Sequence, residues 1–76
     1  MLKELLEHVA RSLVTCPDKV SVEEEVEGTS VILRLSVDSD DMGKVIGKQG
    51  RTAKAIRTLI KAVATRENVK AAVEII

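Results

Sequence analysis

The sequence predicts an α+β fold in which helices cover one face of a mixed three-stranded sheet. The first observation is length, because 76 residues bury only about 60% of the unfolded surface and support one core, so residues 1–76 are expected to form a single domain. The second is the spacing of apolar residues along the chain, which indicates in turn a helix, two strands, a short helix, a long helix and a strand. The third is the connection before the last strand, which holds two helices and therefore fits a parallel strand pair.

An amphipathic helix and a β-hairpin open the chain. Apolar residues three and four apart predict the helix, and Pro17 predicts its end at about Thr15 or Cys16. Two half-buried strands are predicted next, because apolar and polar residues alternate on both sides of turn residues 27–30. The apolar positions are Leu2, Leu5, Leu6, Val9, Ala10, Leu13 and Val14 in the helix, then Val20, Val22, Val26, Val31, Leu33, Leu35 and Val37 in the strands.

Two further helices and a strand complete the predicted order. Ser39, Asp40 and Asp41 offer capping oxygens for a short helix near Met42, which Gly47 should stop after about one turn. A long amphipathic helix follows, and an alternating strand ends the chain. The long helix runs from about Gly50 to about Asn68 with Ala53, Ile56, Leu59, Ile60, Val63 and Ala64 as its apolar stripe, of which Ile56, Leu59 and Ile60 are expected in the core, and the strand alternates Val69, Ala71, Val73 and Ile75.

Composition excludes one mode of nucleic-acid binding and leaves another open. The chain has no Phe, Tyr or Trp, so it cannot stack bases on aromatic rings. The net charge is zero, yet four basic and ten acidic residues give residues 1–41 a charge of −6, while eight basic and two acidic residues give residues 42–76 a charge of +6. From Met42 to Lys61 there are six cations and no acid. These cations either solvate a helix face or form a local positive field.

An acidic run lies in the first predicted strand. Its members are Glu23, Glu24, Glu25 and Glu27. Such a run typically forms a solvated outer face that discourages edge pairing. It could also repel RNA from that side of the domain.

The loop between the two predicted helices joins two glycines to two cations. Gly47 and Gly50 allow positive φ and a close ligand approach, because they carry no Cβ. The amides that open the next helix favour a phosphate. Lys48 and Arg51 add full charges, and the Gln49 amide can bond phosphate or sugar. The loop is therefore predicted to clamp a nucleic-acid backbone.

A phosphate-binding P-loop is a poor fit to this region. That motif needs four residues between its glycines and Ser or Thr after its lysine. Here three residues separate Gly43 from Gly47, and Gln49 follows Lys48. Nucleotide hydrolysis is therefore not expected.

Catalytic, metal and membrane signals are incomplete. Asp38, Asp40 and Asp41 fail the calcium-loop spacing, so capping and a turn are the better interpretation. His8 has no second ligand, and Cys16 has no His or Asn constellation around it, so neither a metal site nor a catalytic thiol is expected. No apolar run approaches the roughly 20 residues of a membrane span. We expect a cytoplasmic protein that is not an enzyme and needs no cofactor.

Residues 45–57, Val-Ile-Gly-Lys-Gln-Gly-Arg-Thr-Ala-Lys-Ala-Ile-Arg, resemble the signature of the KH domain. The element order is similar to that of the type II, bacterial variant, and the short length resembles the small bacterial KhpA-type proteins. The resemblance implies single-stranded RNA in a groove beside the loop, with Val45 and Ile46 under the bases. The RNA-binding residues that it implies are Lys44, Val45, Ile46, Gly47, Lys48, Gln49, Gly50, Arg51, Lys54 and Arg57.

The same resemblance implies a biological setting. It suggests a homodimer, or a heteromer with a larger KH-containing protein, in the cytoplasm. It also suggests an RNA-metabolism regulator or RNA chaperone linked to cell shape and division.

A second hypothesis is an assembly or scaffold subunit in which the glycine loop is only structural. Helix-to-helix turns commonly need glycine, so the loop alone does not separate the two hypotheses. The acid-free basic stretch separates them, because scaffolding does not require it.

Overall fold

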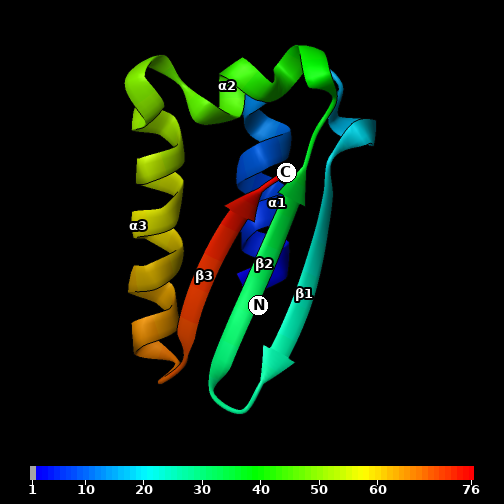
Figure 1. The fold of residues 1–76 in the computed structure, drawn as a ribbon. Helices are drawn as coiled ribbons and strands as arrows, with labels where there is room; N and C mark the ends of the chain where they lie inside the picture. The colour runs from blue at the N-terminus through cyan, green and yellow to red at the C-terminus, as the bar shows by residue number, and fades with distance from the viewer. Residues whose placement is uncertain (1) are drawn as a thin grey trace.

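The structure, a computed structural model, describes residues 2–76 and has the predicted order of elements (Figure 1). The elements are α1 (Leu2–Leu13), β1 (Ser21–Glu27), β2 (Ser30–Ser36), α2 (Met42–Ile46), α3 (Arg51–Arg66) and β3 (Lys70–Ile75). Short 3-10 turns at Pro17–Lys19, Ser39–Asp41 and Lys48–Gly50 lie between them. The α-β-β-α-α-β prediction is confirmed.

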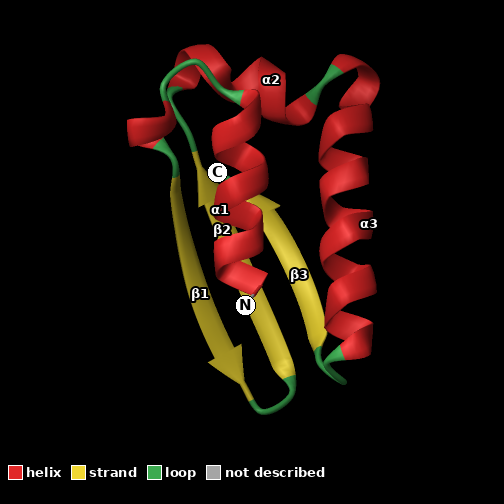
Figure 2. Ribbon diagram, turned by 180° about the vertical axis from the view of Figure 1, so that it is seen from behind, coloured by secondary structure: helices red, strands yellow, loops and turns green. Residues whose placement is uncertain are grey.

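The sheet is mixed, as predicted, with the strand order β1-β2-β3. The hairpin makes β1 and β2 antiparallel, with Val22 opposite Leu35. The two-helix crossover makes β2 and β3 parallel, with Leu33 opposite Val73. Helix α1 lies across one face of the sheet and α3 runs beside β3, while α2 spans one end of the molecule (Figures 1 and 2). Within residues 2–76 the opposite face of the sheet carries no helix.

One hydrophobic core fills the space between the sheet and the helices. Strand β2 contributes every second residue to it, as the alternation predicts. The buried cluster comprises Leu2, Leu6, Ala10, Val20, Val22, Val31, Leu33, Leu35, Ile56, Ile60, Ala64 and Val73. The long helices are apolar on one side only, and none of the helices within residues 2–76 has the length and hydrophobicity that a bilayer span requires.

Three apolar positions of the predicted pattern lie at the surface instead. Leu59, expected in the core, is 41% exposed, and Leu13 is 38% exposed. Both line an apolar hollow between α1 and α3 that no side chain of residues 2–76 fills. Val26 is 61% exposed, near the tip of the hairpin, which extends past the start of α1 (Figure 2). The spacing of apolar residues predicts which side of a helix they occupy. Packing against the neighbouring elements determines whether those residues are buried.

A buried carboxylate joins the end of α1 to the start of α2. The side chain of Asp41 has no exposed surface. Its Oδ1 accepts hydrogen bonds from the Thr15 hydroxyl at 2.7 Å and the Thr15 amide at 3.1 Å, and its Oδ2 accepts one from the Cys16 amide at 3.0 Å. Lys44 Nζ lies 3.4 Å from Oδ1. The bond from the Thr15 hydroxyl, with those from the two amides and Lys44, lowers the pKa of Asp41 to about 2, although burial opposes this shift.

The contacts of Asp41 show that two of the sequence predictions were wrong. Helix α1 ends at Leu13 rather than at Thr15 or Cys16, because Asp41 accepts the two amides that a continued helix would direct to carbonyls four residues earlier. Asp41 does not cap α2 with its side chain, although it occupies the N-cap position.

The pKa of Asp41 makes stability depend on pH in a defined window. The unfolded carboxyl titrates at about 3.9, so its stabilising contribution is complete above about pH 4 and is lost as the pH falls through the folded value of about 2. We expect Asp41→Asn to lower Tm by about 5 °C near pH 7, because a buried hydrogen-bond network is broken. The difference from the unchanged protein should shrink toward pH 2 in thermal unfolding followed by circular dichroism.

Asp40→Asn is the matched control, because Asp40 is adjacent and exposed. Its Tm should follow that of the unchanged protein at every pH. A penalty for Asp41→Asn that is equally large at pH 2 and pH 7 would contradict the role of the ionised carboxylate.

Candidate nucleic-acid interface

The loop between α2 and α3 is built from positive φ angles. Gly47 ends α2 at φ 77°, ψ 173°, and its amide donates to the Gly43 carbonyl at 2.8 Å. Gln49 has φ 58° and Gly50 has φ 74°. The Gly50 amide donates to the Gly47 carbonyl at 3.1 Å, whereas within residues 2–76 the Lys48 amide donates no backbone bond of this kind. The chain thus turns from one helix into the next with the Lys48 amide available to an external acceptor.

The two glycines are required for different reasons. A Cβ on Gly47 would run into the Thr52 side chain and lie 2.8 Å from the Thr52 amide nitrogen, which real Cβ atoms do not approach. A Cβ on Gly50 would meet nothing within 4 Å, so only its left-handed backbone favours glycine there. The loop therefore packs directly on the first turn of α3 through Gly47.

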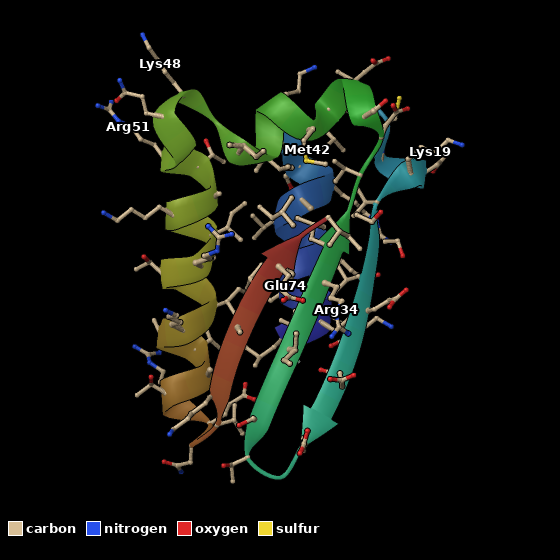
Figure 3. All side chains as sticks on the ribbon, in the orientation of Figure 1. Lys19, Arg34, Met42, Lys48, Arg51 and Glu74 are labelled. Atoms are coloured by element: carbon tan, nitrogen blue, oxygen red, sulfur yellow. The ribbon has the colours of Figure 1, made fainter. Side chains whose placement is uncertain are left out.

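The cations of the loop are exposed and project from one corner of the molecule. Figure 3 shows Lys48 and Arg51 pointing away from the body of the protein. Neither lies within 4.0 Å of a carboxylate of residues 2–76. Arg51 reaches the Gln49 side-chain oxygen at 3.4 Å. Lys44, by contrast, is partly engaged by Asp41 at 3.4 Å. The strongest free positive charge of the loop thus comes from Lys48 and Arg51.

Helix α3 continues the positive surface along its β3 side. Lys54 is exposed, one turn beyond Arg51. Arg57 follows after three more residues, and its Nε donates to the Val73 carbonyl at 3.3 Å. That bond places Arg57 across the space between α3 and the free edge of β3. The guanidinium is thus oriented by the strand and keeps its terminal nitrogens for another partner.

Two apolar residues of the predicted site have different positions. Ile46 is 38% exposed beside the loop, whereas the Val45 side chain is fully buried. Ile46 can therefore contact a ligand directly. Val45 instead anchors α2 to the rest of the protein, and that packing positions the loop.

The open face of the sheet carries the opposite charge. Glu23, Arg34 and Glu74 lie side by side across the three strands, on the face opposite the buried residues. Arg34 pairs with Glu74 at 3.1 Å and with Glu25 at 3.7 Å, and Figure 3 shows Arg34 and Glu74 together on the strands. The acidic run lies on β1, at the opposite edge of the sheet from β3, beside which the basic helix α3 runs (Figure 1).

The mixed sheet, the helices on one face and the Gly-x-x-Gly loop between α2 and α3 together define a KH domain. A family model described as the KhpA/KhpB KH domain matches residues 3–75, so the chain belongs to this family. Proteins named RNA-binding protein KhpA are similar over the whole chain, with 61% identity in Clostridium acetobutylicum and 59% in Clostridium perfringens. Each of these alignments covers 99% of this chain and 100% of the relative.

A further bacterial relative and two solved structures agree with this assignment. The KhpA protein of Halalkalibacterium halodurans is 52% identical, covering 99% of both chains. The Era structure from Aquifex aeolicus matches with a TM-score of 0.65 at 16% identity, and Era in complex with 16S ribosomal RNA nucleotides matches with 0.58 at 19%. These matches cover 97% of this chain but only 29% and 28% of the Era chains, and they support the fold alone. Family membership confirms that the chain is not an enzyme.

Sequence reasoning missed the contacts that support the site from a distance. The Asp41 carboxylate bonds residues 25 and 26 positions earlier, and Arg57 bonds a carbonyl 16 positions later. Asp41 follows Asp38, Ser39 and Asp40 in the sequence, and nothing in that cluster distinguishes the one carboxylate that is buried and bonded to a distant segment. Among residues 2–76 no group of His, Cys, Asp and Glu side chains is placed to hold a metal ion.

The contact between Gly47 and Thr52 predicts unequal effects of alanine at the two glycines. Gly50→Ala should lower the free energy of unfolding by roughly 1 kcal/mol, the cost of a left-handed backbone at a residue with a Cβ. Gly47→Ala should lower it by roughly 2–3 kcal/mol, because the steric clash adds to that strain. Urea unfolding measures both values.

Adding Thr52→Ala to Gly47→Ala tests the cause. It removes the hydroxyl but leaves the backbone amide in contact, so part of the lost stability should return. Equal losses at Gly47 and Gly50 would show that close packing of the loop on α3 is not the constraint.

Proposed function

We propose that the chain binds single-stranded RNA without catalysis, gripping the sugar-phosphate backbone with the loop Gly47–Gly50. The observation that carries the proposal is the loop itself: three positive φ angles turn the chain at a point where the Lys48 amide has no backbone acceptor, beside two cations without an acidic partner among residues 2–76. The names of the bacterial relatives, RNA-binding protein KhpA, support the same ligand. The whole chain is proposed to act as one domain.

The grip is proposed to use positive charge and backbone donors together. Phosphate oxygens would accept hydrogen bonds from the loop amides, and Lys48 and Arg51 would neutralise their charge. Lys54 and Arg57 would follow the strand along α3, and Ile46 would give the bases an apolar contact. Because the chain has no aromatic residue, this recognition depends mainly on the backbone, as expected of a KH loop.

The biological role fits a regulator or chaperone of RNA in the cytoplasm. A backbone clamp with little base readout can engage many RNAs and release them readily. The acidic open face of the sheet would keep RNA on the helical side.

Reversing the charge of the loop should abolish binding while the fold survives. Lys48→Asp with Gln49→Asp places two anions where phosphate should lie, and Asp tolerates the left-handed backbone at position 49. We expect at least a thirtyfold loss of affinity for a labelled single-stranded RNA in fluorescence anisotropy. The Tm should change by less than about 3 °C, since both side chains are exposed.

A matched control changes the charge by the same amount elsewhere. Lys19→Asp with Ser21→Asp lies at the edge of the sheet away from α3, where Figure 3 labels Lys19. The affinity of this variant for the labelled RNA should fall by less than threefold. Equal losses in the two variants, or an unchanged affinity of the loop variant, would refute the clamp.

We further propose that one copy is not sufficient for function. A clamp on about four nucleotides without aromatic stacking has few sources of affinity. Micromolar binding, roughly −8 kcal/mol, selects poorly among cellular RNAs, whereas two linked domains gain from effective concentration. Self-association, or pairing with a larger KH-containing protein, would supply the second domain. The exposed apolar residues Leu13, Val26, Leu59 and Ile76, which are not assigned to the RNA site, support a contact of this kind.

Light scattering and RNA titration test this second proposal. The mass in solution should exceed that of one 8.3 kDa chain at micromolar concentration, or rise when a KH-containing partner is added. A four-nucleotide RNA should bind no tighter than micromolar. A strictly monomeric protein that holds the four-nucleotide RNA at nanomolar strength would contradict the need for a second domain.

A further inference from the structure

A basic hollow lies at the end of α3 that is farthest from the glycine loop. It has a volume of about 230 Å³ and is lined by residues from the last turns of α3 and the start of β3, two elements that lie next to each other in Figure 1. Its lining residues are Lys61, Ala64, Thr65, Val69, Lys70 and Ala71. Small apolar residues thus form the floor, and two lysines stand on opposite elements of the rim.

The turn after α3 holds these two elements together. Asn68 has φ 59° and reverses the chain, while the Val69 amide donates to the Ala64 carbonyl at 3.0 Å in the pattern of a Schellman motif. The Lys70 amide then donates to the Thr29 carbonyl at 2.8 Å, which fixes the start of β3 to the hairpin. Lys70 is therefore held beside α3 by backbone geometry.

The charge in this hollow is positive and unbalanced. Lys61 and Lys70 are exposed, and no carboxylate of residues 2–76 lies within 4.0 Å of either ammonium. The Thr65 hydroxyl donates to the Lys61 carbonyl at 2.9 Å. The helix dipole places about half a negative charge at the C-terminal end of α3, which disfavours an anion there. The two full positive charges of Lys61 and Lys70 outweigh it. The hollow therefore favours an anion.

The hollow lies on the same side of α3 as the basic residues near the loop. Lys54, Arg57 and Lys61 follow one another at spacings of three and four, so they share one side of the helix. The bond from Arg57 to the Val73 carbonyl shows that this side borders β3. Lys61 lies eleven residues after Gly50, or about 16 Å along the helix axis. A strand leaving the loop along α3 would meet Lys61 and Lys70 next.

We propose that Lys61 and Lys70 form a second phosphate-binding site for the RNA strand held by the glycine loop. The inference rests on the proposed RNA-binding function and extends it, because it assigns the protein a footprint longer than the four nucleotides of the loop clamp. A four-nucleotide RNA fills the clamp alone. A longer strand runs along the α3 and β3 side and places a further phosphate between the two lysines.

Oligouridines of four and eight nucleotides, titrated at several salt concentrations, test the site. For the unchanged protein, the slope of log affinity against log salt should steepen by about 0.7–1.4 between the two lengths, because one or two more phosphates are neutralised. Lys61→Gln with Lys70→Gln keeps much of each aliphatic stem and removes both charges. This variant should lose five- to tenfold affinity for eight nucleotides and the added slope, but less than twofold for four.

Lys19→Gln with Arg66→Gln is the matched control, since it removes two exposed cations that do not line the hollow. The affinity of this control for RNA should fall by less than twofold with either four or eight nucleotides. Equal losses in both variants, or an equal loss at both lengths in the lysine variant, would mean that the lysines act only through the general field and would overturn the site.

The stoichiometry and the loop variant separate this site from the other proposals. Titrations at saturation should give one protein per eight-nucleotide RNA. The site would be overturned if the gain in affinity from four to eight nucleotides required two proteins per RNA and persisted in the lysine variant. If eight-nucleotide binding survives Lys48→Asp with Gln49→Asp but not the lysine variant, the clamp fails and the site stands. Binding of neither RNA by the unchanged protein would overturn both.

Discussion

The position of the glycine loop depends on the buried carboxylate of Asp41. Helix α2 has only five residues, too few to be stable by itself. The hydrogen bonds from Thr15 and Cys16 to Asp41 fix the start of α2 against the end of α1, and the buried Val45 fixes its middle. An ionised side chain without exposure is tolerated because all its bonds are formed. The hydrogen bonds that stabilise the buried charge of Asp41 thereby also orient α2 and the glycine loop that follows it.

The loop itself combines rigidity with exposure. Gly47 packs directly against Thr52, so the loop is seated on the first turn of α3. Gln49, a residue with a Cβ, is nevertheless held at φ 58°. Left-handed backbone of this kind is mildly unfavourable and is characteristic of positions where structure serves a ligand. The Lys48 and Arg51 side chains point away from the body of the protein at the same loop (Figure 3), and the proposed phosphate contact rests on this combination.

Charge separation resolves the apparent conflict between a neutral chain and an anionic ligand. Four glutamates lie on β1 and Glu74 lies on β3, and on the open face of the sheet Arg34 is held between Glu25 and Glu74. The cations gather on the loop and on the β3 side of α3. A ligand at close range responds to the local field rather than to the net charge, because salt screens beyond about 8–10 Å. The zero net charge of the chain is therefore compatible with a local positive field at the loop and along α3.

The sequence by itself determined the order of the elements, the mixed sheet and the glycine loop, because these depend on periodicity and on glycine chemistry among near neighbours. Tertiary structure alone decided where α1 ends, since the amides of Thr15 and Cys16 bond a carboxylate 26 and 25 residues away. It also decided that Leu59 is exposed, that Arg57 bonds the edge of β3, and that Lys61 and Lys70 share one hollow. Local patterns give each side chain a direction along its own element. Only the packing of one element on another determines what that side chain meets.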